Sequence, residues 1–274
     1  MKLLNLNIFR GYHTQFHNKY NWKNRRNQLK EFVRVLKPDI ILFQECNKLK
    51  HNESVEEFMF SIPEYNYSIY YSYPNIYRSR ALIIGYNPLV VFKTNEMIRW
   101  LSDTPDIPSD SWGLPGDNYG RIIVGNKFIK VVNDKPTNDY FWIFNTHFDV
   151  NYSSIIGSIK LLPPLINEFI NNDNAKVIIA GDFNTDMEIL FKSFKKYGFL
   201  HQSNDLITLD DKLLRYTFIG KRDENGDLEE FLYLDHIFGK NITKKKIYCP
   251  FSYDFIFREY TMSDHLPIVF DFDL

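Results

Sequence analysis

Short apolar runs that end in polar residues are the feature that most restricts how this chain can fold. The clearest run is at residues 176–186, KVIIAGDFNTD, where four apolar residues precede Gly181 and then Asp182 and Asn184. A run of this length, bounded by turn residues, predicts a strand buried on both faces. Gly-Asp and Asn also form ordinary turns, so this run alone fits either a site or a plain strand-to-loop turn.

Polar side chains end other apolar runs in the same way, at residues 1–9, 39–45, 140–146 and 231–238 and just before 266–272. A turn or a satisfied core polar group explains any single case. The positions together are Asn7, Glu45, His147, Asp182, Asn184, Asp235, Asp264 and His265. Strands alternating with helices and hairpins would bring these ends to one edge of a two-sheet sandwich, so the set favours a site.

Apolar spacing predicts the helices. Residues 20–37 repeat apolar side chains at three- and four-residue steps, and the other face carries Lys23, Arg25, Arg26, Lys30 and Arg34. We expect this basic face to be solvated, with nucleic-acid contact as the alternative. Residues 154–171 predict a helix that Pro163 and Pro164 kink or break. Shorter helices are expected at 54–60 and after Asp186.

The middle of the chain is rich in strands and turns. Strands are predicted at 67–73, 81–86 and 89–93, and a long loop at 99–118. Residues 121–124 and 128–132 predict a hairpin, and Asn225-Gly226 predicts a second hairpin turn between 216–220 and 231–238. Loops as long as 99–118 often carry function.

Composition excludes several classes of protein. The chain has 274 residues with 33 basic and 34 acidic side chains, which argues against tight general binding to polyanions. Two cysteines provide neither a disulfide framework nor zinc spacing. The apolar start is too short for a signal peptide and no run has transmembrane length, so we expect no membrane span and an intracellular protein. Without repeats or linkers, residues 1–274 predict a single domain, and we expect a monomer.

The polar inventory points to hydrolysis assisted by a metal. It consists of carboxylates, amides and imidazoles, and no Ser or Cys nucleophile motif is present. Carboxylate oxygens suit Mg²⁺, with Mn²⁺ as a substitute. A divalent cation with carboxylates and histidines fits hydrolysis of a phosphate ester, in which charge is neutralised and a water is activated.

Six short motifs, in this order along the chain, resemble the endonuclease/exonuclease/phosphatase superfamily. They are Asn7, LFQE at 42–45, NTH at 145–147, GDFN at 181–184, LDHI at 234–237 and SDH at 263–265. The resemblance implies a deoxyribonuclease-I-like α/β fold. This is a four-layer α/β sandwich in which two mixed, mainly antiparallel sheets pack face to face with helices outside. The WLSDTP segment at 100–105 also resembles a loop of a bacterial-type branch of the superfamily.

The resemblance implies a role for each motif residue. Glu45 would be the main Mg²⁺ ligand and Asp264 a second or outer ligand. Asp182 would orient or deprotonate the attacking water, supported by Asn184. His265, oriented by Asp235, would stabilise charge on the phosphorus or assist the leaving oxygen. Phosphate oxygens would be contacted by His147, Arg121 and Asn7. Alternatively, Asn7 would hold the ligand shell of the metal.

Two departures from the superfamily pattern concern individual positions. No glutamate that could pair with His147 stands near residues 77–81, and His236 stands where many relatives have Arg, Tyr or Trp. Three functions remain open. The first is a nuclease on DNA or RNA. The second is the same chemistry on a small phosphorylated molecule or a lipid head group. The third is a non-catalytic binding module on the same fold.

Overall fold

The apolar runs form strands with both faces buried. In β8 (Lys176–Asp182), Val177 and Ile179 pack toward one core and Ile178 and Ala180 toward another, all with at most 1% of their surface exposed. Successive strand side chains point to opposite faces, so a continuous apolar run indicates a layer on each side.

The computed structural model describes residues 1–9, 22–46, 55–73, 81–110, 112, 120–220 and 231–274. The elements in chain order are β1 (Lys2–Asn7), α1 (Trp22–Leu36), β2 (Ile40–Gln44), α2 (Val55–Phe60), β3 (Asn66–Tyr71), β4 (Ala81–Tyr86), β5 (Val91–Trp100), β6 (Ile122–Val132), β7 (Lys135–His147), α3 (Tyr152–Ile170), β8 (Lys176–Asp182), α4 (Glu188–Lys196), β9 (Leu200–His201), the 3₁₀ helix η3 (Ser203–Asp205), β10 (Asp235–Lys240), β11 (Thr243–Tyr248), α5 (Tyr253–Arg258) and β12 (Ile268–Asp273).

Within the described residues, the strands form two six-stranded sheets with the orders β11-β12-β1-β2-β4-β3 and β5-β6-β7-β8-β10-β9. The pairs β1–β2 and β7–β8 are parallel, and the other pairs are antiparallel. A parallel pair needs a crossover, which α1 supplies in one sheet and α3 in the other. Each sheet therefore carries helices on its outer face.

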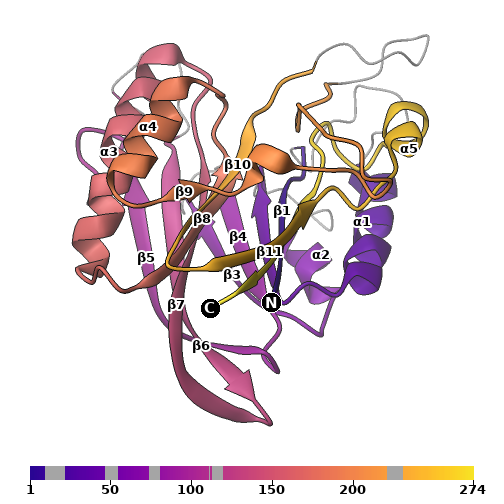
Figure 1. The fold of residues 1–274 in the computed structure, drawn as a ribbon, viewed down its shortest axis with the longest axis horizontal. Coiled ribbons are helices and arrows are strands. Elements are labelled where there is room, and N and C mark those ends of the chain that lie inside the picture. Colours follow the sequence, from indigo (N-terminus) through magenta and orange to yellow (C-terminus); the bar gives the residue numbers. More distant parts are fainter. Residues whose placement is uncertain (10–21, 47–54, 74–80, 111, 113–119, 221–230) are drawn as a thin grey trace.

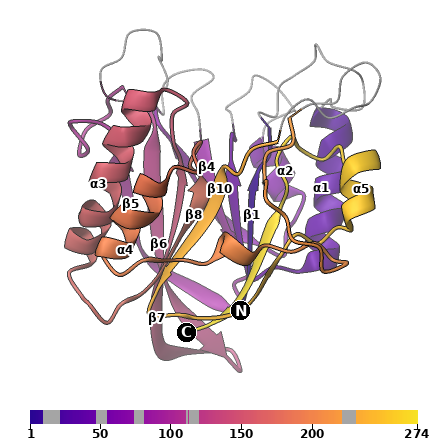
Figure 2. The same cartoon turned by 45° about the horizontal axis from the view of Figure 1, so that its top comes forward.

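The two sheets face each other between two helical layers. Figure 1 and Figure 2 show α3 and α4 beside the β5–β10 sheet and α1, α2 and α5 beside the other. One apolar cluster lies between the sheets and extends under α1, and a second fills the space between α3, α4 and their sheet. This arrangement confirms the four-layer α/β sandwich expected from the sequence.

The hairpin predicted from 121–124 and 128–132 is wrong. Both segments belong to one continuous strand, β6, which pairs with β5 and β7. In the sequence Gly125 suggests a turn. In the structure it makes room for a neighbouring side chain, because a Cβ at this position would lie 2.3 Å from the Phe144 ring. The neighbouring Asn126 is buried and accepts a hydrogen bond from the Tyr70 hydroxyl.

Two further expectations need correction. The tandem Pro163-Pro164 does not break the helix, since α3 runs through both residues and buries Leu162, Pro163 and Ile166 on one face. The strand predicted at 89–93 continues to Trp100, so the loop predicted from Arg99 begins later. β5 is an edge strand with several exposed polar side chains and a bulge after Lys93. Its sequence therefore does not show the two-residue alternation of a strand.

Several expectations fall wholly or partly outside the described residues. These are the start of the first helix, the first residue of the helix expected at 54–60, residues 111 and 113–118 of the 99–118 loop, and the turn at 225–226. None of the helices in the described part of the chain combines the length and the hydropathy needed to cross a membrane.

Candidate active site

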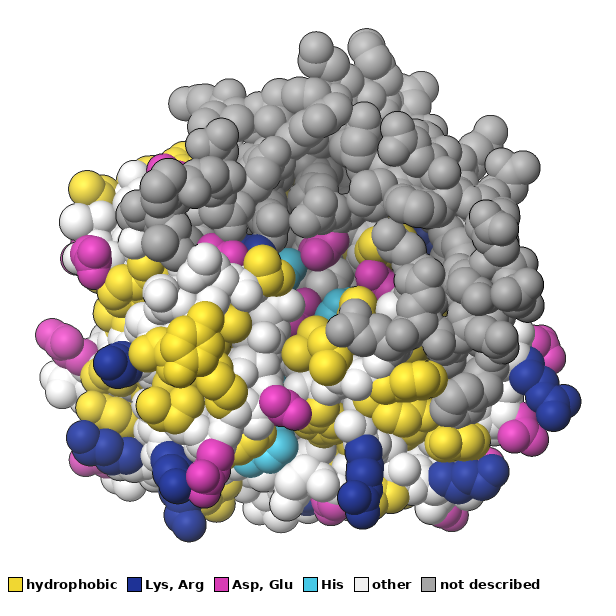
Figure 3. Space-filling view, turned by 90° about the horizontal axis from the view of Figure 1, so that it is seen from above, with side chains coloured by type: hydrophobic (Ala, Val, Ile, Leu, Met, Phe, Trp, Pro, Cys, Tyr) yellow, Lys and Arg dark blue, Asp and Glu magenta, His cyan; other side chains and the backbone are white. Residues whose placement is uncertain are grey.

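The strand period places the predicted site residues on one edge of the sandwich. In β8 the inward residues are Ile178 and Ala180, so Asp182 points inward as the strand ends. Asp182 is directly opposite both His147 of β7 and Asp235 of β10 in the strand register. Figure 3 looks down on this edge, where acidic side chains and imidazoles gather near the centre of the face.

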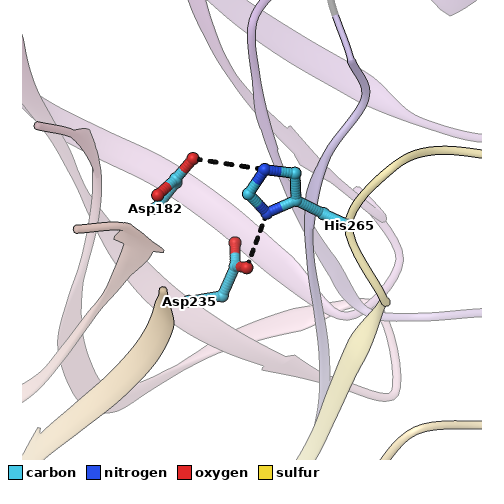
Figure 4. Close-up of side chains that lie close together, drawn as sticks. All are labelled: Asp182, Asp235 and His265. Atoms are coloured by element: carbon cyan, nitrogen blue, oxygen red, sulfur yellow. Dashed lines mark hydrogen bonds and ion pairs between the residues drawn. The ribbon is translucent and has the colours of Figure 1, made fainter. Parts of the chain in front are cut away.

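His265 links the two sheets chemically. Its Nδ1 lies 2.7 Å from Asp235 Oδ2 and its Nε2 lies 3.6 Å from Asp182 Oδ2 (Figure 4). The expected Asp235–His265 hydrogen bond is therefore present. The sequence also predicts that these two residues lie on neighbouring strands, and this prediction is wrong: Asp235 begins β10 in one sheet and His265 precedes β12 in the other.

The two carboxylates keep His265 protonated. Burial lowers the pKa of this imidazole, but Asp235 and Asp182 outweigh burial and raise it to about 10. An imidazolium donates from both nitrogens, so Nδ1–H bonds to Asp235 and Nε2–H points to Asp182. The three side chains form a buried chain with a positive charge between two carboxylates.

Asp182 is the hub of the hydrogen bonds. Asn7 Nδ2 donates to its Oδ2 at 2.9 Å, and the backbone N–H of Asn184 donates to its Oδ1 at 2.9 Å. His147 Nε2 lies 3.5 Å from the same Oδ2. Asn184 has a positive φ of 49°, which asparagine tolerates, and its amide holds the Phe148 carbonyl at 2.9 Å. Burial raises the pKa of the Asp182 carboxyl.

Glu45 and Asp264 are neighbouring carboxylates that could hold a metal ion. Burial, with a further contribution from Glu45, raises the pKa of Asp264 to about 7 although the neighbouring His265 lowers it. A buried carboxylate next to a second carboxylate is stabilised by a cation, and hard oxygen donors suit Mg²⁺ or Mn²⁺.

A second group of potential ligands is less suited to a metal. Asp182, Asp235 and His265 offer ligand atoms within 4.8 Å of one another. Contacts with one another and with Asn7 use Asp182 Oδ2, Asp235 Oδ2 and both His265 nitrogens, which leaves Asp235 Oδ1 without a hydrogen-bond partner among the described residues. A protonated histidine has no lone pair to offer.

Arg25 contradicts the expectation that the basic face of the first helix is solvated. Its side chain is 0% exposed and donates to the carbonyl oxygens of Ile8, Phe9 and Met262 at 2.9–3.0 Å. Burial lowers its pKa to about 10, against opposing effects of Asp264 and Glu45, so the charge persists at neutral pH. This cation joins the segment after Asn7 to the segment before Asp264, and sequence periodicity gave no sign of it.

Arg121 is buried beside His147 and has an acidic neighbour that the sequence analysis missed. Asp149 is 1% exposed, and its Oδ1 lies 4.0 Å from an Arg121 guanidinium nitrogen. Arg121 and His147 line one small cavity of about 10 Å³. The NTHFD pattern could have pointed to Asp149, which lies two residues after His147.

Two hydroxyl side chains missed by the sequence analysis also fix the site. Thr217 Oγ1 accepts from the backbone N–H groups of Leu234 and Asp235 at 3.0 and 2.9 Å, which holds the start of β10. Ser263 donates to the Asn7 carbonyl at 2.6 Å and accepts from the His265 N–H at 3.2 Å. Ser263 belongs to the SDH motif, whereas no motif marked Thr217.

Known proteins share this sequence pattern and fold. The model of the endonuclease/exonuclease/phosphatase family matches residues 4–265. Uncharacterized protein L388 of Acanthamoeba polyphaga mimivirus is 52% identical over 273 residues, covering 100% of both chains. The mannosyl-6-phosphatase Bt3783 of Bacteroides thetaiotaomicron superposes with a TM-score of 0.79 at 20% identity over 100% of both chains. D. rerio TDP2, solved with a single strand DNA product, has a TM-score of 0.65 at 14% identity and covers 100% of this chain and 99% of its own.

Proposed function

Because this chain belongs to the endonuclease/exonuclease/phosphatase family, we propose that it hydrolyses phosphodiester bonds by direct attack of water, with DNA or RNA as substrate. The observation that carries the proposal is the buried Asp235–His265–Asp182 chain at the joint edge of both sheets. Residues 1–274 would form one domain, since the site needs both sheets. The WLSDTP segment would place the protein in the branch of the superfamily with that loop.

Asp182 would take the proton from the attacking water. Its carboxylate is held by the Asn7 amide and the Asn184 backbone N–H, so it is aimed before substrate arrives. His265, charged and oriented by Asp235, would face the negative charge that develops on the phosphoryl oxygens or on the leaving oxygen. No covalent intermediate is needed, because water attacks phosphorus directly.

Arg121 and His147 would bind phosphate oxygens, with Asn7 as a further donor. The assignment rests on the two residues lying side by side: both line one small cavity, which at about 10 Å³ has room for a water molecule and not for a phosphate. Asp149 would act as a positioning residue for Arg121 and not as a ligand of the substrate. A carboxylate beside a buried guanidinium would keep it in a fixed orientation toward a bound anion.

Glu45 and Asp264 would hold Mg²⁺, or Mn²⁺ in its place. Bound there, the ion would neutralise phosphate charge and lower the pKa of a coordinated water. The carboxylate-rich surroundings and the raised pKa of Asp264 support this position. Glu45→Gln keeps the shape of the ligand but removes its charge and should lower turnover strongly without unfolding the protein.

A second candidate is hydrolysis of a small phosphorylated molecule such as a sugar phosphate. The observation that favours it is the likeness to the mannosyl-6-phosphatase, whose fold covers this chain completely. The chemistry at phosphorus would be the same, so the substrate and not the mechanism separates the two candidates.

The first experiment measures turnover of bis-(p-nitrophenyl) phosphate with Mg²⁺, with Mn²⁺ and with EDTA, followed by single-stranded DNA, duplex DNA, RNA and sugar phosphates. We expect metal-dependent turnover and a preference for nucleic acid.

Asp182→Asn should lower kcat by about 10²–10⁴-fold while direct binding of the same substrate persists. Turnover that EDTA leaves unchanged would contradict the metal assignment, and near-normal kcat in Asp182→Asn would move the base role to another residue. No turnover at all would favour a binding module.

A further inference from the structure

A cavity of about 360 Å³ lies on the outer side of the strands that carry Asp182 and Asp235. Its walls include the rings of Phe191 from α4, His201 from β9 and Tyr233. None of these residues belongs to the active site described above.

The rings of this cavity are held in place by neighbouring contacts. The Tyr233 hydroxyl donates to the Ser203 carbonyl, and the Phe191 and His201 ring centroids are 4.6 Å apart. His201 Nε2 lies 3.2 Å from His236 Nδ1, and His236 Nε2 lies 2.8 Å from the Thr185 carbonyl oxygen. A cavity with fixed walls loses little conformational entropy when a flat ligand enters.

The wall residue His201 and the neighbouring His236 are both neutral. Burial lowers the pKa of His201 to about 4 and that of His236 to about 3. His236 must donate from Nε2 to the Thr185 carbonyl, so its Nδ1 accepts and His201 Nε2 carries a proton. These imidazoles therefore offer ring faces and neutral hydrogen bonds, and do not form a second phosphate site.

Among the described lining residues, Asp186 and Arg215 carry one charge of each sign. Both side chains are exposed, and neither forms an ion pair with another described residue. A carboxylate accepts from ring N–H and amino groups, and a guanidinium donates to carbonyl oxygens and ring nitrogens. A planar heteroaromatic ring with both kinds of polar edge matches these walls and these two charges.

Two lining residues of the cavity lie a few residues beyond the strand ends that carry Asp182 and Asp235. Asp186 follows Asp182 by four residues. Tyr233 precedes Asp235 by two residues, or about 7 Å of extended chain. His236, which contacts the wall residue His201, also bonds to the carbonyl of Thr185, the residue before Asp186.

We infer that this cavity binds the nucleobase of a nucleotide adjacent to the bond that is cut, an inference that rests on the proposed nuclease function. The base stacks on the ring walls, and Asp186 and Arg215 bond to its polar edge. The cavity would thus favour nucleic acid over phosphate esters that lack a base.

The first test compares kcat/KM for a short single-stranded oligonucleotide with kcat/KM for bis-(p-nitrophenyl) phosphate, which has no nucleobase. In Arg215→Gln the ratio of oligonucleotide to small ester should fall about tenfold, the size expected for loss of one good base contact. Tyr233→Leu should lower the same ratio. Lys196→Gln is the matched control, because it removes the same charge from an exposed position of α4 outside the cavity.

The second test does not depend on activity. Guanosine, which has no phosphate, is titrated into the full-length protein while the imidazole signals are followed by ¹H–¹⁵N NMR, with the His201 signal identified by its loss in His201→Gln. Guanosine should shift the His201 signal in wild type and shift it less in Arg215→Gln.

The outcomes separate this inference from the proposed function. An unchanged ratio in Arg215→Gln, or a His201 signal that guanosine does not shift, overturns the cavity assignment while turnover of the small ester leaves the proposed function intact. A shift by mannose but not by guanosine replaces the nucleobase with a sugar and overturns the inference. If wild type hydrolyses neither ester, the proposed function fails, and the guanosine titration still decides whether the cavity takes a base.

Discussion

At the scale of single residues, the site combines side chains that a strand pattern marks with side chains that nothing in the sequence marks. Asp182 and His147 could be predicted because each is the next inward position at the end of an apolar strand. Arg25 and Thr217 could not, because each acts through backbone atoms that become its neighbours in the folded chain, such as the carbonyl of Met262 or the N–H of Asp235.

Replacing Arg25 tests how far one buried cation stabilises the site. Arg25→Met leaves three buried carbonyl oxygens without their donor, and should lower the free energy of unfolding by about 3–5 kcal/mol in urea titrations. Arg25→Lys should recover part of this loss, since it keeps the charge but cannot reach all three carbonyls.

The control for this experiment is Arg34→Met on the same helix. Arg34 is 40% exposed and pairs with Glu31 at 3.4 Å, so its loss should change stability by at most about 0.5 kcal/mol. Equal effects of Arg25→Met and Arg34→Met would show that the buried hydrogen bonds add nothing.

At the scale of elements, long apolar runs were predicted well and mixed strands poorly. β8 could be predicted because both of its faces are buried. β5 could not, because it is an edge strand with exposed polar side chains, and β6 could not, because it contains Gly125, which resembles a turn residue. Gly125 is required by the Phe144 ring of the next strand, and no local pattern contains that information.

Gly181 fixes the geometry of the strand end on which the site is built. It has φ +152°, and a Cβ there would lie 2.0 Å from the Thr146 carbonyl oxygen of β7. Gly181→Ala should therefore lower the free energy of unfolding by about 2–4 kcal/mol and reduce turnover, because the backbone next to Asp182 must shift.

Gly198→Ala separates backbone strain from the clash. Gly198 also has a positive φ, +83°, but its nearest contact would be the flexible Lys240 side chain at 3.5 Å. This variant should lose about 1 kcal/mol from the backbone conformation alone and keep its turnover. A Gly181→Ala protein as stable and active as Gly198→Ala would disprove the close approach of β7.

The neutral histidine of β10 should make stability depend on pH. The pKa of His236 is lowered from 6.5 to about 3, chiefly by burial, so between these values the unfolded chain binds a proton that the folded chain excludes. Stability is then complete above pH 6.5 and falls as the pH drops, by about 2 kcal/mol between pH 6.5 and 5. His236→Gln keeps a donor near Nε2 but does not titrate, so its thermal midpoint should fall less over this range. Parallel curves for the two proteins would assign the pH dependence to other groups.

At the scale of the whole molecule, a buried polar network joins the two sheets directly beneath the site. Gln44 Nε2 donates to Asn5 Oδ1 at 2.9 Å within one sheet and to Asn145 Oδ1 at 2.8 Å in the other. Asn145 Nδ2 returns two hydrogen bonds, to the carbonyls of Phe43 and Ile83 at 3.0 Å. Two motif residues of the sequence, Gln44 and Asn145, therefore hold the sheets in register and do not touch the reaction centre.

Because this network joins the two sheets, a change in it should affect both the stability of the sandwich and the geometry of the site. Asn145→Leu removes both donors and the acceptor from a fully buried position and leaves Gln44 and two carbonyls without hydrogen-bond partners. The free energy of unfolding should therefore fall by about 3 kcal/mol or more. Turnover should fall as well, because Asp182 and His265 lie on opposite sheets and their 3.6 Å separation depends on how the sheets meet. In the double variant Gln44→Leu/Asn145→Leu the Gln44 amide no longer faces a missing acceptor, and only Asn5 Oδ1 and the two carbonyls lose a donor, so the loss should be smaller than the sum of the two single losses. Urea unfolding of the four proteins gives this coupling directly, and strictly additive losses would mean that the two amides stabilise their own sheets and not the contact between them.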